Sequence, residues 1–453
     1  MDTQSLKGKK VLAVGLDGVP KTLLDGFMAA GRMPRLKKIL SSGFKLHQMD
    51  ASIPEVSSTS WTSFYTGVNP GEHGIFGFME LRAGTYALNF PNSGDVHAPA
   101  FWEVAAGEDG AGESTLSKKY AGKFKAPLRS VVMNIPQTYP ARPMNGVLSA
   151  GFVCPDLKKG TYPESAYDYL VSMGYMPDVD AALAAKDPGA FFEEIYRSLE
   201  KRALAYEHFM SSAGWDIFTG VVTETDRLHH FFFDAAKDPS HKYHETFLEI
   251  YTIIDELIWK LYSRFMDMTG GEGFFLTMSD HGFTEIRSEV YVNRWLKEEG
   301  FLKLNEERKY FDKIDDGSRV FALDPARFYL NLAGKYPRGA VRKEDAEAVS
   351  RDLRGALNSF KDREGNSVIR AVYGRDELYT GGSVQIGPDL VCLPEDGYDL
   401  KGNLRMDGVF GTSHFTGMHT RHDAHVILPE GTITGERLHI ENLASIMLDY
   451  LSA

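Results

Sequence analysis

The stretch Leu276–Phe283 reads LTMSDHGF and directly follows Gly273-Phe274-Phe275, so a continuous apolar run ends in an acid and a histidine. An apolar run of this length that is bounded by turn residues is typical of a buried strand. A strand that is buried on both faces needs no acid–imidazole pair at its end. The sequence therefore raises the question of what Asp280 and His281 hold.

Further apolar runs of the same kind predict buried strands at 11–16, 131–135, 217–222, 274–278 and 426–428. Helical patterns lie between or after them, at 34–40, 188–213, 244–268 and 438–450. Strands that alternate with helices predict an α/β fold, in which a mostly parallel central sheet is covered by helices on both faces. In such sheets ligands bind beyond the carboxyl ends of the strands.

Two stretches interrupt this alternation. Residues 82–128 are rich in Gly, Ala and Lys without a clear period, and residues 302–385 contain short strand-like pieces and one charged helix. We interpret both as insertions that cap the sheet. The chain of 453 residues is then a single domain, 1–453, whose core spans about 8–81, 129–301 and 386–453.

Composition argues against several classes of protein. The net charge is −12 and no run of Lys and Arg stands out, which argues against a structural nucleic-acid partner. No window is apolar over the 18 residues that a membrane helix needs, and the N-terminus, MDTQSLKGKK, has no apolar secretory segment. The two cysteines, Cys154 and Cys392, favour neither a disulfide framework nor a cysteine metal site. We expect a cytoplasmic protein.

Acids and histidines also follow the other predicted strands. Asp17 ends the strand at 11–16, and the segment TETDRLHHFFF after the strand at 217–222 places Asp226 and His230 four residues apart. That spacing puts both side chains on one face of a helix. In GMHTRHDAHVIL, His419 lies in a polar loop before the strand at 426–428.

If these strands are neighbours in one parallel sheet, their terminal side chains meet at one edge. Taken singly, an Asp at a strand end can cap a helix, and a lone His is more often a hydrogen-bonded group than a ligand. Six such residues at four strand ends are not explained by independent caps and predict a metal site. A mixed Asp and His set favours zinc or manganese. The candidate ligands are Asp17, Asp226, His230, Asp280, His281 and His419.

A segment rich in hydroxyl groups lies between the first two of these motifs. Residues 57–63 read SSTSWTS, and Trp61, Phe64 and Tyr65 then give the apolar stripe of a helix. Coordination to a divalent cation lowers the pKa of a serine and makes it a nucleophile. The segment could also be a hydroxyl-rich helix cap, and chemistry alone does not decide which hydroxyl attacks.

Five motifs, taken together with their spacing, form a specific signal for a protein family, although any one of them alone would be weak. GLDGVP, PEVSSTSWTSFYTGVNPGEHGIFGF, TETDRLHHFFF, SDHGF and GMHT together resemble the alkaline phosphatase superfamily, and within it the type I phosphodiesterase/nucleotide pyrophosphatase branch. The resemblance covers nearly the whole chain. It implies a three-layer alkaline-phosphatase-like core with cap insertions.

Carried over position by position, the resemblance implies two divalent cations, zinc or manganese. It assigns one to Asp226, His230 and His419, and the other to Asp17, Asp280 and His281. Counting back from Thr66-Gly67, the nucleophile is Ser57. Relatives often have threonine at this position and proline two residues later, whereas this chain has Ser57 and Thr59. Thr59 therefore stays a second candidate.

The implied activity is metal-dependent hydrolysis of a small phosphate-ester substrate, at phosphodiester or nucleotide pyrophosphate bonds, through a covalent intermediate on Ser57. An alternative is a phosphomutase or phosphomonoesterase that resembles the cofactor-independent phosphoglycerate mutases. An inactive phosphate-ligand sensor is the alternative outside enzymes, although all six ligands are present. For Arg227 and Arg294 we expect surface ion pairing rather than phosphate binding, and for His229 we expect either packing or a supporting contact behind a ligand. The sequence leaves the natural substrate and the oligomeric state open.

Overall fold

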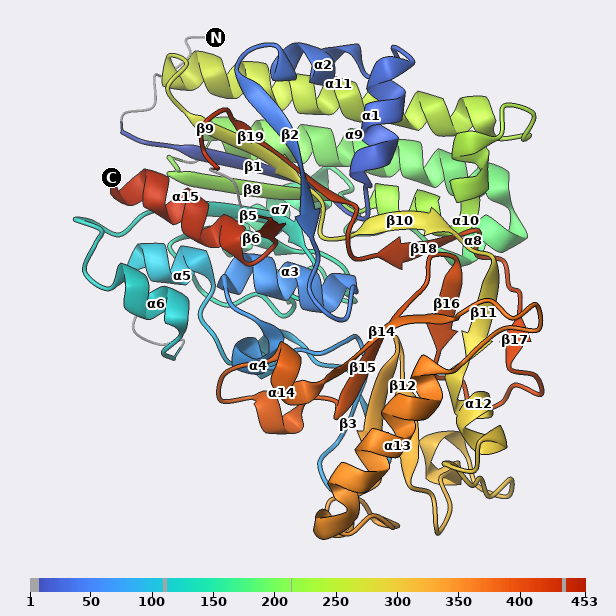
Figure 1. Cartoon of the computed structure of the whole chain (residues 1–453). Helices are drawn as coiled ribbons and strands as arrows, with labels where there is room; N and C mark the ends of the chain where they lie inside the picture. The colour runs from blue at the N-terminus through green and yellow to red at the C-terminus, as the bar shows by residue number, and fades with distance from the viewer. Residues whose placement is uncertain (1–7, 109–111, 213, 434–436) are drawn as a thin grey trace.

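The computed structural model describes residues 8–108, 112–212, 214–433 and 437–453. Its centre is a nine-stranded sheet with β1 (Val11–Leu16) in the middle (Figure 1). β1 pairs in parallel with β8 (Ile217–Val222) on one side and with β9 (Phe274–Met278) on the other. All three strands are fully buried, as their continuous apolar sequences predict.

The sheet continues outward on both sides of these strands. Beyond β8 lie β5 (Ser130–Ile135), β6 (Gly146–Ala150) and β7 (Thr161–Tyr162). Beyond β9 lie β19 (Ala424–Pro429), β2 (Phe44–Asp50) and β20 (Leu438–His439). β19 runs antiparallel to both β9 and β2, so its first residues lie at the edge where the parallel strands end.

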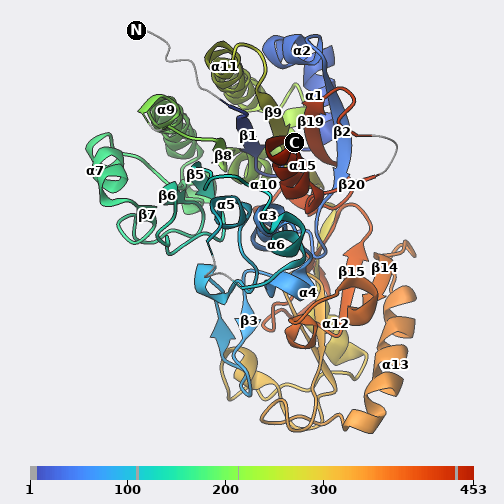
Figure 2. The same cartoon turned by 90° about the vertical axis from the view of Figure 1, so that its left-hand side faces the viewer.

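Helices cover both faces, so the expected α/β class with a mostly parallel sheet is confirmed (Figure 2). One face packs against α1 (Lys21–Ala29), α2 (Pro34–Leu40), α7 (Glu164–Ser172), α8 (Ala182–Lys186), α9 (Pro188–Ser212), α10 (Glu224–Lys237) and α11 (His244–Thr269). The other face packs against α3 (Ser57–Thr66), α5 (Phe101–Ala106), α6 (Thr115–Tyr120) and α15 (Asn442–Ser452). None of the described helices combines the length and the apolar character needed to cross a lipid bilayer.

The remaining elements form a smaller layer below the sheet in Figure 1. A four-stranded sheet runs in the order β12 (Val320–Leu323), β13 (Arg327–Leu330), β15 (Leu390–Pro394) and β14 (Ile369–Gly374), with α13 (Ala346–Asn358) and α14 (Arg375–Leu378) beside it. A three-stranded sheet contains β16 (Tyr398–Lys401), β11 (Ser288–Tyr291) and β17 (Phe410–Gly411), and α12 (Val292–Glu298) follows β11. β10 (Gly282–Glu285) pairs antiparallel with β18 (Gly417–Thr420), which is distant in the chain. β3 (Glu80–Leu81) and β4 (Leu88–Asn89) form a short hairpin, and α4 spans Pro70–His73. The division into core and cap insertions stays a prediction.

Three larger differences separate the prediction from the structure, of which the last is a strand that was missed. The C-terminal helix starts at Asn442 rather than at 438, because residues 438–439 pair with the edge strand β2. His419 was expected in a loop but lies on β18, where backbone pairing with Phe283 holds it. The strand β2 was not predicted, because its half-exposed middle has no continuous apolar run. The predicted end of the helix at 213 lies outside the described residues.

Candidate active site

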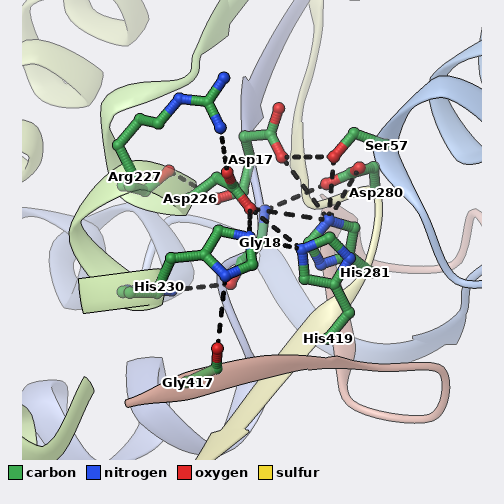
Figure 3. A network of polar contacts seen from close by, with 12 residues as sticks. Asp17, Gly18, Ser57, Asp226, Arg227, His230, Asp280, His281, Gly417 and His419 are labelled. Atoms are coloured by element: carbon green, nitrogen blue, oxygen red, sulfur yellow. Dashed lines mark hydrogen bonds and ion pairs between the residues drawn. The ribbon is translucent and has the colours of Figure 1, made fainter. Parts of the chain in front are cut away.

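The fold brings the six candidate ligands together at the carboxyl edge of the sheet (Figure 3). Asp17 directly follows β1, Asp226 lies in the first turn of α10 after β8, and Asp280-His281 follows β9. Because these three strands are parallel neighbours, their ends meet. His230 lies one turn further along α10, and the antiparallel pairing of β18 with β10 brings in His419.

Two groups of three side chains could each hold a metal ion. One group is Asp17, Asp280 and His281, and the other is Asp226, His281 and His419, with all ligand atoms of a group within 4.8 Å of one another. The first group is the expected one, whereas in the second His281 stands in the place expected for His230. His230 is nevertheless adjacent, since its Nε2 lies 3.4 Å from Oδ1 of Asp226 and 3.0 Å from Nε2 of His419.

The three histidines are oriented in the same way. Each places Nδ1 at hydrogen-bond distance from a backbone carbonyl: His281 from Gly282 (3.0 Å), His230 from Gly417 (3.3 Å) and His419 from Glu55 (2.9 Å). When Nδ1 donates this bond, Nε2 is left without a proton and faces the carboxylates. Such an outer contact is typical of metal-binding histidines, because it fixes both the ring and the tautomer.

The three carboxylates share a second pattern. In each, one oxygen accepts a hydrogen bond from a fixed donor: Trp61 Nε1 to Asp17 (3.0 Å), the Gly18 N–H to Asp280 (3.0 Å) and Arg227 Nη1 to Asp226 (3.1 Å). The other oxygen of each faces a histidine Nε2, at 3.7 Å for Asp17, 3.3 Å for Asp280 and 3.3 Å for Asp226. The inward oxygens therefore converge with the inward nitrogens.

Two of these inward oxygens, Asp226 Oδ1 and Asp280 Oδ2, are buried and accept no hydrogen bond from any part of the chain that the structure describes. A buried carboxylate oxygen without a partner is costly, so a site built in this way requires a positive ligand. The donors are carboxylate oxygens and imidazole nitrogens, which suit zinc or manganese. The residues present thus fit divalent cations.

Without cations, burial and neighbouring charges shift the pKa values of the proposed ligands. Burial, followed by repulsion from the Asp280 and Asp226 charges, raises the pKa of Asp17, and burial raises the pKa of Asp280 to about 7. Burial also acts to raise the pKa of Asp226, but the nearby imidazoles of His230 and His419 and the charge of Arg227 outweigh it and lower that pKa. Burial, together with repulsion from His419, lowers the pKa of His281. The protein alone leaves these negative charges poorly compensated.

Ser57 is the hydroxyl that lies among these groups. As the first residue of α3 it is 5 % exposed, and its Oγ lies 3.1 Å from Nε2 of His281 and 3.4 Å from Oδ1 of Asp17. Thr59 is fully buried, and its hydroxyl has no hydrogen-bond partner among the described residues. The geometry therefore favours Ser57 over Thr59 as the reacting hydroxyl.

Several supporting residues were not identified from the sequence. Trp61 was read as part of an apolar stripe, yet its indole N–H holds Asp17. Arg227 does form ion pairs, with Asp178 at 2.7 Å as well as with Asp226, but it is largely buried rather than on the surface. Its position directly after Asp226 was the only signal. Arg294 pairs with Glu298 at 2.8 Å, as expected.

His229 points away from the cluster, as its place on the other helical face predicts. Its Nδ1 lies 2.9 Å from the carbonyl oxygen of Gly18, and its Nε2 lies 2.7 Å from the hydroxyl of Tyr251. Gly18 is the residue whose N–H binds Asp280. His229 therefore connects α10 to Gly18, which follows Asp17 in the chain and holds Asp280.

Comparisons with known proteins identify the family of the chain and its relatives in fold. The sequence profile of the family described as type I phosphodiesterase / nucleotide pyrophosphatase matches residues 11–422, which is most of the chain. No protein with a curated description matches the chain in sequence.

Two solved structures illustrate the likeness in fold. Phosphonoacetate hydrolase from Sinorhizobium meliloti 1021, in complex with phosphonoacetate, has a TM-score of 0.62 at 16 % identity, with 99 % of this chain and 100 % of that chain covered. Murine ectonucleotide pyrophosphatase/phosphodiesterase 5, in complex with AMP, has a TM-score of 0.55 at 14 % identity, with 98 % and 95 % covered. At these identities the likeness shows the fold alone.

Proposed function

The chain belongs to the type I phosphodiesterase / nucleotide pyrophosphatase family of phosphoester hydrolases, and on that premise we propose that it hydrolyses phosphodiester or nucleotide pyrophosphate bonds through Ser57. The observation that carries the proposal is the position of Ser57 Oγ, 3.1 Å from His281 Nε2 and 3.4 Å from Asp17 Oδ1. No other hydroxyl among the described residues forms a hydrogen bond to a side chain of the six proposed ligands.

Two divalent cations, zinc or manganese, would be held by the six ligands. We assign one to Asp17, Asp280 and His281 and the other to Asp226, His230 and His419. When bound, such cations lower the pKa of a coordinated hydroxyl and offset the charge on the phosphoryl oxygens. The chain supplies the ligand atoms already turned inward, so little reorganisation is needed.

Ser57 then acts as the nucleophile. Its Oγ attacks phosphorus, the bond from phosphorus to the leaving oxygen breaks, and the phosphoryl group becomes esterified to Ser57. Because Ser57 begins α3, the free N–H groups and dipole of that helix end favour the negative phosphoryl group. Water hydrolyses the serine ester in the second half and restores the hydroxyl.

The test compares a nitrophenyl phosphodiester with the matching nitrophenyl monoester, in the presence of Mn²⁺ or Zn²⁺. We expect faster turnover of the diester, loss of turnover in Ser57→Ala and retention of turnover in Thr59→Val, which removes the neighbouring hydroxyl at nearly constant volume. Preference for the monoester would instead favour the phosphatase or mutase alternative. Loss of turnover in Thr59→Val alone would make Thr59 the nucleophile.

A further inference from the structure

A separate pocket of about 310 Å³ opens directly beside the candidate active site. His230, His419 and Val56, the residue before Ser57, line it on the side of the large sheet. Its opposite wall comes from the smaller layer, through Asp324 and Lys401. The pocket adjoins the place of the reacting phosphorus, because His230 and His419, whose Nε2 atoms face Asp226 in the candidate site, also line the pocket.

The rest of the lining is largely apolar. Phe78, Met79, Phe415 and Met418 contribute to it. A buried arginine, Arg327, ties two walls together, since it donates from Nη2 to the carbonyl oxygen of Met79 (2.6 Å) and from Nε to that of Asp324 (2.8 Å). The pocket is therefore preformed, and its volume is at the lower end of the range for small-molecule sites.

The charged groups of this lining are unequal in number. Three acidic side chains, Glu55, Asp324 and Asp399, stand against the ammonium of Lys401 among the described lining residues. Lys401 Nζ forms an ion pair with Asp399 Oδ2 at 2.7 Å. Burial acts to lower the pKa of Lys401, but Asp399, Asp324 and Glu289 together raise it, so several carboxylates surround this one cation.

Glu55 independently indicates that the pocket takes a hydrogen-bond donor. Its side chain is 8 % exposed, and its Oε2 has no hydrogen-bond partner within the described part of the chain. A buried acceptor of this kind needs a donor, and leaving it without one costs about 1–3 kcal/mol. An ammonium or hydroxyl group on a ligand supplies that donor, whereas a carboxylate or phosphate does not.

An aromatic ring connects this lining to the proposed cation site. The Phe415 ring lies 5.3 Å from the His230 ring and 5.6 Å from Nζ of Lys401, measured from the ring centroid. The face of an aromatic ring attracts a positive group. Lys401 already takes this place at the Phe415 ring, so a cationic substituent a few bonds away from phosphorus would find an unused acceptor and an excess of acidic side chains.

We propose that this pocket binds the alcohol portion of the substrate and selects a compact amino alcohol over an alcohol with an anionic substituent. The inference rests on the proposed function, because it concerns the ester group of the same reaction. It also predicts that nucleoside polyphosphates, which extend further negative charge from the reacting phosphorus, are poor substrates.

The experiment uses three nitrophenyl phosphodiesters whose second alcohol has the same length and ends in an ammonium, a methyl or a carboxylate group. The readout is the ratio of kcat/KM for the ammonium diester to kcat/KM for the carboxylate diester. We expect a ratio of roughly tenfold, because unscreened charges in a partly dehydrated pocket interact strongly.

Two variants with opposite charge changes sharpen the test. Lys401→Met removes the ammonium of the lining and should raise the ratio, whereas Asp399→Asn removes a carboxylate and should lower it. Lys297→Met, at an exposed ion pair with Glu306 outside the pocket, should leave the ratio unchanged. A purely structural role for the Lys401–Asp399 pair would lower the melting temperature of both variants without moving the ratio.

A wild-type ratio of one or less would overturn the inference, and so would a ratio that Lys401→Met lowers or leaves unchanged. These outcomes leave hydrolysis through Ser57 intact. If the wild-type enzyme turned over none of the three diesters and no simple nitrophenyl diester, the proposed function itself would fail, and this inference would fail with it.

Discussion

Arg227 donates from Nη1 to Oδ2 of Asp226 across 3.1 Å, while Oδ1 of the same carboxylate lies within 4.0 Å of the Nε2 atoms of His230, His281 and His419. Arg227 is itself fixed, because Asp178 accepts from its Nη2 at 2.7 Å and the guanidinium lies 4.2 Å from the centroid of the Phe152 ring. The arginine therefore determines which oxygen of Asp226 faces the histidines.

From this geometry we expect Arg227→Met to weaken divalent-cation binding by about 10–100-fold, the usual effect of losing an outer partner of a ligand. Asp178→Asn should act in the same direction but less strongly, because Arg227 keeps its contact with Asp226. Calorimetric titration of the cation-free protein with Zn²⁺ or Mn²⁺ measures both. Arg294→Met serves as the control, since Arg294 pairs with Glu298 on a helix surface. Unchanged affinity in Arg227→Met would show that Asp226 holds its orientation without the arginine.

Cations should also stabilise the fold. A ligand that binds only the folded state, at a free concentration of about 100 times its Kd, adds about 2.7 kcal/mol to the free energy of unfolding. Adding Zn²⁺ or Mn²⁺ to protein treated with a chelator should therefore raise its melting temperature. Asp280→Asn removes a ligand and a buried charge, so this variant should be less sensitive to the cation and at least as stable as the wild type without it. Thermal unfolding of both proteins with and without cation is the measurement. An equal upward shift in both would argue against Asp280 as a ligand.

Gly15 in β1 provides a test of packing behind the site. A Cβ atom at this position would overlap the ring of Trp61 and lie 3.0 Å from Cγ2 of Val221. Gly15→Ala should therefore cost about 1–3 kcal/mol of stability through overpacking, and it should weaken the cation site by displacing the indole that holds Asp17. Denaturant unfolding and cation titration measure the two effects.

The matched control for that change is Gly26→Ala in α1. Among the residues that the structure describes, no atom lies within 4 Å of a Cβ at Gly26 apart from its own helix backbone and chain neighbours. Alanine is also favoured over glycine in a helix. This variant should be more stable than the wild type by about 0.5–1 kcal/mol. A Gly15→Ala protein as stable as Gly26→Ala would mean that Trp61 can move without cost.

His73 predicts a dependence of stability on pH. It is fully buried, its Nδ1 accepts from the N–H of Ile75 at 3.1 Å, and its Nε2 lies 2.9 Å from Oγ of Ser63. Burial, with a smaller contribution from His97, lowers the pKa of His73 to about 3. The unfolded chain therefore binds a proton near pH 6.5 that the folded chain does not bind, so stability is lost as the pH falls below 6.5.

Between pH 7 and pH 5 this group alone should remove about 2 kcal/mol from the free energy of unfolding. The variant His73→Asn keeps an acceptor near the Ile75 N–H, so it should be less stable at pH 7 but show a flatter pH dependence. Urea unfolding at the two pH values measures the difference, with the partly exposed His241→Asn as control. The same slope in His73→Asn and wild type would show that another group is responsible.

Which parts of the fold could be predicted depends on how local their signal is. The strands β1, β8 and β9 and the helix α2 were predicted with the bounds that the structure has, because a fully buried strand or a compact helix carries its pattern within a few residues. β2 was missed because its middle is half exposed. β20 was missed because it has two residues and pairs with β2, which lies far away in the sequence. The complete burial of the hydroxyl-rich α3 also has no local signal, since it follows from packing against the sheet.

By itself the sequence determined the set of inward-facing side chains: the acids and histidines follow apolar strands, and such strand ends meet wherever parallel strands are neighbours. It did not determine how each side chain is held. The donors to Asp17 and Asp226 are Trp61 and Arg227, and the carbonyl that His419 meets belongs to Glu55. The pairing of Lys401 with the carboxylates of the pocket likewise arises from contact between the two layers. Hydrogen bonds and ion pairs depend on distances between atoms far apart in the chain, and only the tertiary structure fixes those distances.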